Sequence, residues 1–275
     1  KQVQEERVTV AALVPTQLMM MVRHPDFEKY DLSSLRVVVS TGAALAYQDG
    51  VEAEERLGVP VVQAYGSTDS GNGGFADMDE NREERLLTVG KVLPGIERKL
   101  VDDEGKEVPQ GEVGEVWLRS PAAGSGYYRD IETTRQAWTE DGWFKMGDLG
   151  RINRQGNLVL VGRKKDMIIR GGQNIYPAEV ENLLMSHPNV YQAAIVGMPD
   201  PLLGEKCCAY VVPRPGQEFT FDEMVAFLRT KDLAPYKLPE RLESLAELPM
   251  VAEGQKVDKN ALHKDIEAKL KAEGV

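Results

Sequence analysis

The chain has 275 residues, of which 42% are hydrophobic and 28% are charged, and its formal net charge is −11. This composition is typical of a folded protein with one to three domains and excludes a largely disordered chain. The negative balance argues against a nucleic-acid partner, because binding a polyanion requires clustered Lys and Arg. No apolar run approaches the ~20 residues that span a bilayer, so we expect no membrane span.

The start of the chain and its two cysteines bear on its origin. The first ten residues, "KQVQEERVTV", contain no initiator Met and no apolar core of a signal peptide, so we expect the sequence to begin inside a longer protein. Cys207 and Cys208 are adjacent, and neighbouring strand residues point to opposite faces, so we expect no disulfide between them. A chain without a disulfide framework fits the reducing cytoplasm.

Residues 1–84 alternate between helix and strand patterns. The segment "TQLMMMVRH" predicts a helix, with Thr16 as a possible N-cap, and "YQDGVEAEERLG" predicts a second helix that ends at Gly58. Between and after them, "LRVVVS" and "VPVVQAYG" are continuous apolar runs, which are typical of strands covered on both faces. Strand, helix and strand with short connections predict a parallel α/β layer with a right-handed crossover.

Residues 85–163 have a different texture. The stretch "GIERKLVDDEGKEVPQGEVGEVWLRS" alternates apolar positions around a "DDEG" turn, and "NLVLVG" follows an "NRQG" turn. Short strands separated by Gly, Asp and Asn turns favour an antiparallel sheet or a small barrel. A helix over about 130–138 interrupts them, and we expect a β-barrel subdomain over 85–163.

Residues 164–275 mix strands and helices in an α+β pattern. The strand "MIIR" leads through a glycine turn to a helix with Pro177 at its first position, and two strands follow, "YQAAIVG" and "KCCAYVVP". Thr220, with Glu223 three residues later, predicts a capping box, and the last helix is expected after Asp258. We therefore expect three parts: 1–84, 85–163 and 164–275.

Two polar stretches are candidates for chemistry. In "QAYGSTDSGNGG", residues 63–74, a buried strand enters a loop of glycines and hydroxyls, and the carboxyl edge of a parallel sheet is where α/β proteins bind ligands. There Asp69 is a candidate to hold a divalent cation near phosphates. In "GWFKMGDLG", residues 142–150, Asp148 is a candidate to accept hydrogen bonds from a ribose diol. An ordinary polar loop and an ordinary Gly-Asp turn are the alternatives.

Two basic stretches complete the set. Lys256 lies in an extended segment just before a helix, where its long side chain could reach a phosphate oxygen or simply stay solvated. The segment "GRKKDMIIRGGQNIYPAEVE", residues 162–181, combines a basic cluster, a short strand and a bare glycine turn. It suits a charged hinge, and a surface hairpin with no chemical role is the alternative.

Together, the order and spacing of these stretches resemble the adenylate-forming ligase superfamily, which includes acyl- and aryl-CoA synthetases, luciferase and peptide-synthetase adenylation domains. "YGSTD" resembles the YGxTE motif of the family, "MGD" its TGD motif, and "STGAAL" its GGA segment. Residues 162–181 match GRxxDxIxxGGxNIxPxEVE almost position by position, and "LPMVAEGQK" resembles the PxxxxGK element. The likeness covers essentially the whole chain but only the later half of such an enzyme, because a TSGTTGxPK phosphate loop is absent from the sequence.

The resemblance implies activation of a carboxylic acid by ATP and Mg²⁺ through an acyl-adenylate, followed by thioester formation with CoA. It implies an α/β and α+β fold with a partial parallel subdomain, a small antiparallel β-barrel and a mobile C-terminal α+β domain. It assigns catalysis to Lys256, Thr68 and Asp69, with Asp69 as the metal ligand. For the nucleotide it implies contacts from Gly42, Ala43, Tyr65, Gly66, Thr68, Asp148 and Arg163. It places a hinge at Lys165 and the pantetheine channel at Gly171 and Gly172.

Three departures from the family pattern bear on these roles. Asp69 replaces a Glu and is one methylene shorter, Met146 replaces the Thr of TGD, and "GQK" adds one residue before Lys256. The acid, aryl or aliphatic, stays open, as does the acceptor, CoA or a carrier protein, and a homodimer is a further possibility. Segments such as "HPNVYQAAIVGMPDPLLGEKCCAYVVP" also resemble aryl-acid activating enzymes. Without the phosphate loop, the 275 residues alone are expected to be inactive, as a non-catalytic fragment that binds nucleotide or CoA.

Overall fold

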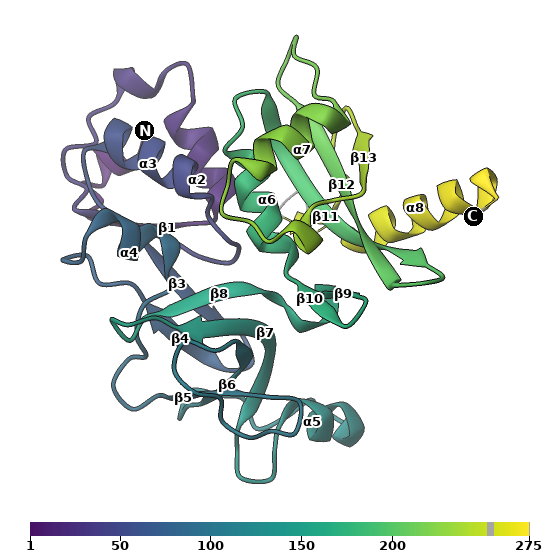
Figure 1. The fold of residues 1–275 in the computed structure, drawn as a ribbon. Helices are drawn as coiled ribbons and strands as arrows, with labels where there is room; N and C mark the ends of the chain where they lie inside the picture. Colours follow the sequence, from purple (N-terminus) through teal and green to yellow (C-terminus); the bar gives the residue numbers. More distant parts are fainter. Residues whose placement is uncertain (252–255, 275) are drawn as a thin grey trace. The chain divides into compact units, whose positions relative to one another are not determined.

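The computed structural model describes residues 1–251 and 256–274 and divides into two compact units, Lys1–Leu160 and Val161–Val275. Figure 1 colours the first unit from purple to teal and the second from teal to yellow. The clusters of buried apolar side chains each lie within one unit. The two units are therefore described one at a time. No helix in the described part of the chain combines the length and the apolar character needed to cross a membrane.

A four-stranded sheet, ordered β1-β2-β3-β4, begins the first unit. Strands β1 (Val10–Leu13), β2 (Val37–Ser40) and β3 (Val61–Ser67) are parallel, and β4 (Gly71–Phe75) runs antiparallel to β3. The parallel pairing of β2 with β3 across a helix confirms the α/β layer predicted from the two apolar runs. The polar loop predicted after "VPVVQAYG" is instead a tight turn followed by β4.

Five helices and a 3-10 turn accompany this unit: α1 (Gln2–Glu5), α2 (Pro15–Val22), η1 (Phe27–Lys29), α3 (Tyr47–Leu57), α4 (Arg82–Leu87) and α5 (Ile131–Ala137). α3 ends at Gly58 as predicted, because glycine adopts the left-handed conformation (φ +69°) that closes the helix. Thr16 was wrong as an N-cap: α2 begins at Pro15, whose missing N–H and fixed φ suit the first helical position, and Val14 precedes it.

An antiparallel sheet ordered β5-β6-β7-β8 follows, made of β5 (Glu97–Val101), β6 (Gly114–Arg119), β7 (Phe144–Ile152) and β8 (Leu158–Arg163). The expected barrel was wrong, because β5 and β8 are opposite edges of an open sheet and do not pair with each other within the described residues. One apolar cluster joins Leu118 and Phe144 of this sheet to Tyr65 and Val89 from outside it. The sheet therefore covers its apolar face with neighbouring elements and does not close on itself.

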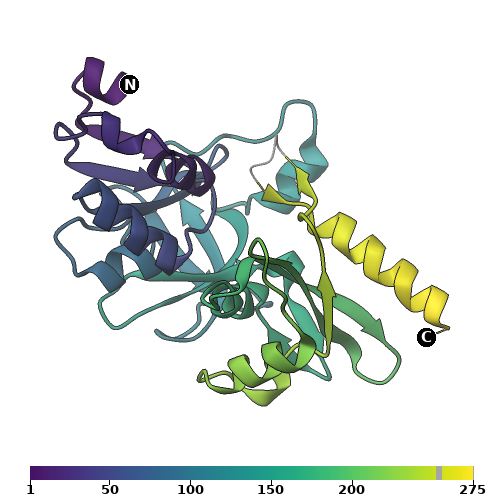
Figure 2. The same cartoon turned by 90° about the horizontal axis from the view of Figure 1, so that it is seen from above.

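The second unit is a five-stranded sheet with helices. Its order is β10-β9-β12-β11, with β13 pairing in parallel with β12. Figure 2 shows the last helix, in yellow, following two short paired strands. The elements are η2 (Lys164–Asp166), β9 (Ile168–Arg170), β10 (Gln173–Ile175), α6 (Pro177–Met185), β11 (Val190–Asp200), β12 (Gly204–Pro213), α7 (Phe221–Arg229), η3 (Pro235–Lys237), β13 (Arg241–Ser244), β14 (Met250–Val251), β15 (Lys256–Val257) and α8 (Lys259–Glu273).

The central strand β12 is buried on both faces. Alternate residues beginning at Cys207 pack into a cluster with α6 and α7, and those beginning at Cys208 pack into a cluster with α8. Both thiols are free, as expected, and burial raises the pKa of each to about 12. The capping box at Thr220 and the start of α8 after Asp258 are also confirmed.

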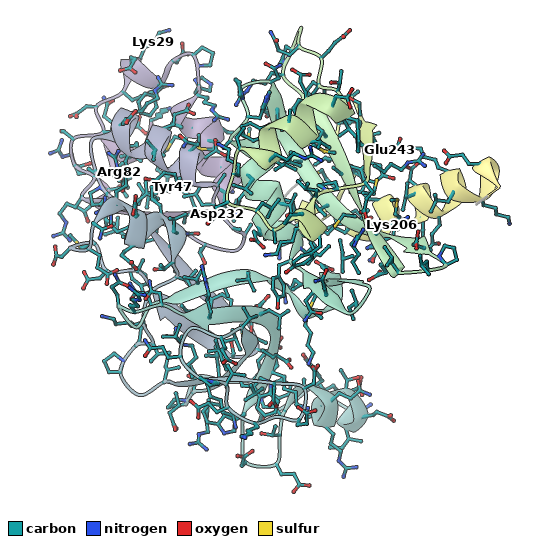
Figure 3. The ribbon with its side chains drawn as sticks, in the orientation of Figure 1. Lys29, Tyr47, Arg82, Lys206, Asp232 and Glu243 are labelled. Atoms are coloured by element: carbon teal, nitrogen blue, oxygen red, sulfur yellow. The ribbon has the colours of Figure 1, made fainter. Side chains whose placement is uncertain are left out.

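Charged side chains reinforce the packing of α8. Lys269 donates to Glu243 of β13 at 2.8 Å, and the buried Tyr210 hydroxyl donates to Asp265 at 2.6 Å. Arg241 of β13 adds a paired contact with Glu273 at 2.7 Å for each nitrogen. Figure 3 shows Glu243 labelled among these side chains. The helix is thus held to the sheet by apolar packing along its length and by ion pairs in its second half.

Candidate active site

The turn between β3 and β4 carries three of the predicted site residues. Gly66 is exposed and follows Tyr65, the last buried residue of β3, and the exposed Thr68 and half-buried Asp69 form the turn itself. Ser67 Oγ accepts from the backbone N–H of Ser70 at 3.1 Å and closes the turn. A Cβ at Gly66 would lie 2.3 Å from the Gly71 carbonyl oxygen, so the close approach of β4 requires glycine there.

A hydrogen bond joins the two polar stretches predicted from the sequence. The Tyr65 hydroxyl donates to Asp148 Oδ2 at 2.7 Å, from β3 to β7 across 83 positions of sequence. Tyr65 is 9% exposed and Asp148 8%, so both groups are largely removed from water. The ring of Tyr65 packs among apolar side chains that include Phe144 and Met146. The carboxylate of Asp148 is therefore held in place by a phenol.

Arg98, on β5, is a basic group near this pair that the sequence analysis missed. Its guanidinium donates to the Gly90 carbonyl at 3.1 Å and to the Gly156 carbonyl at 3.4 Å. Burial lowers the pKa of Arg98 to about 10, against an opposing charge interaction with Tyr65. An arginine in a stretch of alternating strand residues carries no local signal of this role.

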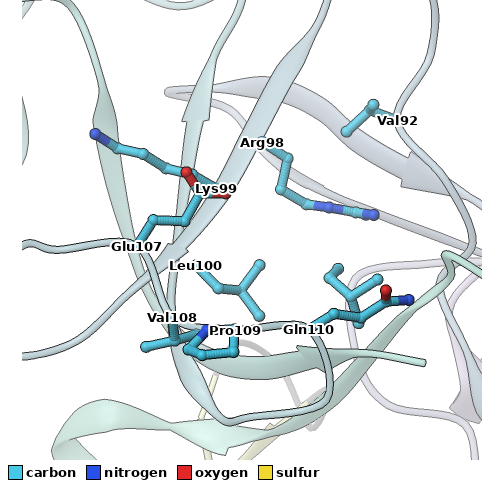
Figure 4. Close-up of a pocket in the computed structure, with 9 residues that line it drawn as sticks. Val92, Arg98, Lys99, Leu100, Glu107, Val108, Pro109 and Gln110 are labelled. Atoms are coloured by element: carbon cyan, nitrogen blue, oxygen red, sulfur yellow. The ribbon is translucent and has the colours of Figure 1, made fainter. Parts of the chain in front are cut away.

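Arg98 also lines an open hollow of about 340 Å³ on the antiparallel sheet. Figure 4 shows Arg98 and Lys99 leaving β5 in opposite directions, as successive strand residues do. Leu100, Val108 and Ile152 supply apolar walls. None of the residues predicted from the motifs lines this hollow, so it is not the site that the sequence predicts.

Asp69 is fixed by the loop that precedes α5. The Gly124 N–H donates to the Asp69 carbonyl at 2.7 Å, and the Tyr127 side chain interacts with that of Asp69. Burial raises the pKa of Tyr127, and the negative charge of Asp69 raises it further. The ring of Tyr127 meets the edge of Trp138 with centroids 5.2 Å apart. The sequence analysis missed Tyr127, for which the glycine-aromatic stretch "GSGYYRD" was the available signal.

Gly42 and Ala43 lie in the loop after β2, exposed. Gly42 has φ +84°, and the Thr41 N–H before it donates to the Leu13 carbonyl of β1 at 3.1 Å. Because β1, β2 and β3 are parallel, this loop and Gly66 lie at the same, carboxyl, edge of the sheet. The structure thus brings Gly42, Ala43 and Gly66, which the sequence predicts to contact a nucleotide, to one sheet edge, where α/β proteins bind their ligands.

The remaining predicted residues belong to the second unit. Arg163 ends β8 and Lys165 lies in η2, and both are exposed. Gly171 and Gly172 form the turn between β9 and β10 with φ of +55° and +82°, so their backbone conformation itself favours glycine. Lys256 is exposed on β15, paired with Val251. The extra residue predicted within "GQK" lies outside the described residues.

Mg²⁺ would find a single carboxylate in the first unit's turn. Within the described residues no group of three or more His, Cys, Asp or Glu side chains is arranged to hold a metal ion. Mg²⁺ commonly uses one or two protein carboxylates and takes its other ligands from water and substrate phosphates. The exposed turn with Asp69 and the Thr68 hydroxyl fits that mode.

The first unit has a parallel sheet with a glycine- and hydroxyl-rich turn at its carboxyl edge, and a buried carboxylate is tied to the strand before that turn. Together with a separate α+β unit, these features are those of the class of AMP-binding enzymes. The AMP-binding enzyme family matches residues 1–128, and the AMP-binding enzyme C-terminal domain matches residues 179–255. The chain belongs to this adenylate-forming family.

Curated relatives and solved structures agree with that assignment. The chain is 38% identical to an indoleacetate–CoA ligase of Aromatoleum aromaticum over 92% of its length and 49% of the relative. It is 37% identical to the 2,3-dihydroxybenzoate-AMP ligase of Bacillus subtilis over 98% of its length and 50% of that protein. The amide bond synthetase McbA from Marinactinospora thermotolerans matches with a TM-score of 0.90 and 37% identity, over 97% of this chain and 53% of that one. The chain spans about half the length of these relatives.

Proposed function

We propose that the protein containing these residues activates a carboxylic acid with ATP as an acyl-adenylate and then transfers the acyl group to the thiol of CoA. The observation that carries the proposal is the 2.7 Å hydrogen bond between Tyr65 and Asp148, which joins two motifs 83 positions apart at one place. The relatives named as CoA and AMP ligases support the same chemistry.

In the first step, electrostatic repulsion between the carboxylate and the α-phosphate must be overcome by the groups of the site. A carboxylate oxygen forms a bond to the α-phosphorus while the bond to the leaving pyrophosphate breaks, so two anions must approach each other. Fixed positive charge and oriented donors stabilise this transition state. In our proposal Lys256 supplies the ammonium group beside the reacting oxygens, and the Thr68 hydroxyl binds the α-phosphate.

Nucleotide binding falls to the sheet edge of the first unit. We assign the ribose hydroxyls to Asp148 and Arg163 and the adenine to the neighbourhood of Tyr65, Gly42 and Ala43. Gly66 lets the nucleotide approach the backbone. Because the Tyr65 phenol already donates to Asp148, the carboxylate keeps its orientation toward the ribose.

Asp69 would hold Mg²⁺, which supplies positive charge that offsets the negative charge of the phosphates. The Asp69 side chain is one methylene shorter than the Glu of the family pattern. The Gly124 N–H holds the Asp69 backbone, and Tyr127 lies beside the Asp69 carboxylate. In the proposed arrangement this carboxylate meets the ion directly or through a bound water.

For the second step we propose that the second unit reorients about Lys165, so that Lys256 serves adenylation and the Gly171–Gly172 turn serves thioester formation. The positive φ of both glycines exposes backbone that a pantetheine arm can pass closely. CoA is the proposed acceptor, in line with the indoleacetate–CoA ligase, and a carrier-protein thiol is the alternative.

The test separates the two half-reactions in the complete natural protein. Lys256→Ala should abolish ATP–pyrophosphate exchange yet largely spare thioester formation from supplied acyl-adenylate. Lys264→Ala, an exposed lysine on α8, is the matched control and should affect neither. Equal losses in both half-reactions would refute the separate role of Lys256. A panel of aryl and aliphatic acids, with CoA as acceptor, would identify the acid.

A second candidate function applies to the 275 residues alone. Because their sequence contains no TSGTTGxPK loop, we propose that by themselves they bind nucleotide or CoA without turnover. Calorimetric titration with AMP and with CoA should show binding, and ATP–pyrophosphate exchange should be absent. Measurable exchange by this chain would overturn the proposal.

A further inference from the structure

Lys256 depends on its surroundings for its position, because its own strand is very short. β15 has two residues, and β14, its partner, also has two. Val257 packs into the apolar cluster beneath α8, so Lys256, one residue earlier, points the other way and is exposed. Two backbone pairings do not fix a strand in water. The anchors that follow Lys256 must therefore set where its ammonium group lies.

The nearest side-chain hydrogen bonds and ion pairs are at the start of α8. The Asp258 N–H donates to the Pro249 carbonyl at 2.8 Å, and Asp258 Oδ1 accepts from the Ala261 N–H at 3.1 Å. Lys259, three residues after Lys256, donates to Glu181 Oε1 at 2.7 Å. The first two contacts close the local chain on itself. Only the third of these ties the segment to a different element, the helix α6.

Glu181 is itself fixed on two sides. The same Oε1 atom that accepts from Lys259 also accepts from the Ile195 N–H at 2.8 Å, on the edge strand β11. The side chains of Glu181 and Lys259 are 16% and 21% exposed, so little water competes with the pair. The carboxylate thus joins α6, β11 and the first turn of α8 at one point.

We infer that the Glu181–Lys259 ion pair is a positioning device that holds Lys256 in place for adenylation. Glu181 lies in the "PAEVE" stretch and Lys259 directly follows "KVD", so the pair connects the two motif segments of the second unit. The inference rests on the proposed role of Lys256. Both residues act through Lys256 and need not touch the nucleotide.

The chain offers a matched control on the same helix. Glu179, two residues before Glu181, accepts from Lys237 at 2.6 Å, and Lys237 lies in η3, away from α8 in sequence and packing. The exposed fraction of the Lys237 side chain, 16%, is close to that of Lys259. Lys237→Met therefore removes an α6 ion pair of the same kind without touching the start of α8.

The kinetic test compares Lys259→Met with Lys237→Met in the complete natural protein. Misplacing a catalytic group by about an ångström costs up to ~100-fold, so Lys259→Met should lower kcat of the adenylation half-reaction by about 10- to 100-fold. The KM for ATP and the rate of thioester formation from supplied adenylate should stay within about twofold, and Lys237→Met should change neither rate. Glu181→Gln, which keeps an acceptor for Ile195 but loses the charge, should fall between the two.

A second readout needs no activity. In the 275-residue chain, Lys259→Met should speed hydrogen exchange of the amides over 257–262, and Lys237→Met should not. Equal effects of the two lysine variants on exchange and on adenylation would overturn the inference. If Lys256→Ala leaves adenylation intact, the proposed function fails instead, and the exchange comparison still decides whether the pair orders the segment.

Discussion

Replacing Tyr65 by Phe removes one hydroxyl and tests whether the pair that joins the two motifs is a real structural unit. The hydroxyl donates at 2.7 Å to a carboxylate, and both residues are more than nine-tenths buried. A hydrogen bond to a charged group contributes about 1.5–3 kcal/mol, and the buried carboxylate of Asp148 would lose that donor without gaining water. We expect Tyr65→Phe to destabilise the first unit by about 2 kcal/mol.

Tryptophan fluorescence measures this unit separately. All three tryptophans, Trp117, Trp138 and Trp143, lie in the first unit, so urea unfolding followed by their emission reports that unit alone. With a slope of about 2 kcal/mol per molar urea, the midpoint should fall by about 1 M. For a unit of this size, about 2 kcal/mol corresponds to a melting temperature lower by roughly 4–8 °C.

Two controls sharpen the result. Tyr128→Phe removes a hydroxyl from a side chain that is 86% exposed and should leave the midpoint unchanged. Asp148→Asn keeps the shape of the side chain but replaces the charged acceptor by a weaker neutral one, so the double-variant cycle with Tyr65→Phe should show a coupling energy of about 1 kcal/mol. A Tyr65→Phe shift below about 0.5 kcal/mol, with no coupling, would mean that the phenol does not hold the carboxylate.

Three further outcomes follow from packing and charge. Gly90→Ala should destabilise the first unit by more than about 3 kcal/mol in the same fluorescence assay, because φ is +69° and the new Cβ would lie 1.9 Å from the Phe75 carbonyl oxygen. Gly105→Ala, with a similar φ of +79° but only an ordinary 3.6 Å contact to Trp117, should cost only about 1–2 kcal/mol. Tyr210→Phe should loosen α8, seen as faster hydrogen exchange along that helix, because the buried hydroxyl loses its 2.6 Å bond to Asp265. The hydrogen bond from Lys269, and then that from Tyr210, hold the pKa of Asp265 below its ordinary value of 3.8. The stabilisation that the ionised Asp265 gives is therefore complete above pH 3.8 and is lost as the pH falls through the lower pKa of the folded state. In urea unfolding followed by circular dichroism, Asp265→Asn should weaken the second unit at pH 7 and differ little from the native chain in strong acid.

The sequence predicts the elements whose burial is uniform. The three valines of "LRVVVS" form an apolar run because β2 is covered on both faces, and Gly58 ends α3 because only a residue tolerant of positive φ closes it that way. The same logic works for β12, where alternate residues enter two different cores. In these cases the local sequence pattern is enough to predict which residues are buried and where the element ends.

The sequence does not predict β4 or the open edge of the antiparallel sheet. "GNGGF" has poor strand propensity, and its glycines are there because side chains would collide: a Cβ at Gly73 would lie 2.3 Å from Leu118 Cδ1, and one at Gly74 would lie 2.5 Å from the Val89 carbonyl oxygen. Whether β5 pairs with β8 is equally a matter of distant partners. A period-two pattern contains no information about either.

The candidate site divides in the same way. Motif resemblance selects Tyr65, Asp69 and Asp148 from the sequence, but their partners come from elsewhere in the fold. Tyr127 reaches Asp69 from a loop 58 positions later, and Arg98 is oriented by two carbonyl groups. Tyr127 and Arg98 can be recognised as part of the site only from the folded structure, because the fold brings them to their partners.

The adjacent buried cysteines of β12 provide a native probe for opening of the second unit. Both thiols are fully covered and, with a pKa of about 12, are almost wholly protonated near neutral pH, so an alkylating reagent can modify them only when the second unit opens. The rate of thiol modification therefore reports how often the second unit opens, and tryptophan fluorescence reports unfolding of the first unit. The native chain thus has a separate probe for each unit, tryptophans in the first and cysteines in the second, and no label has to be added.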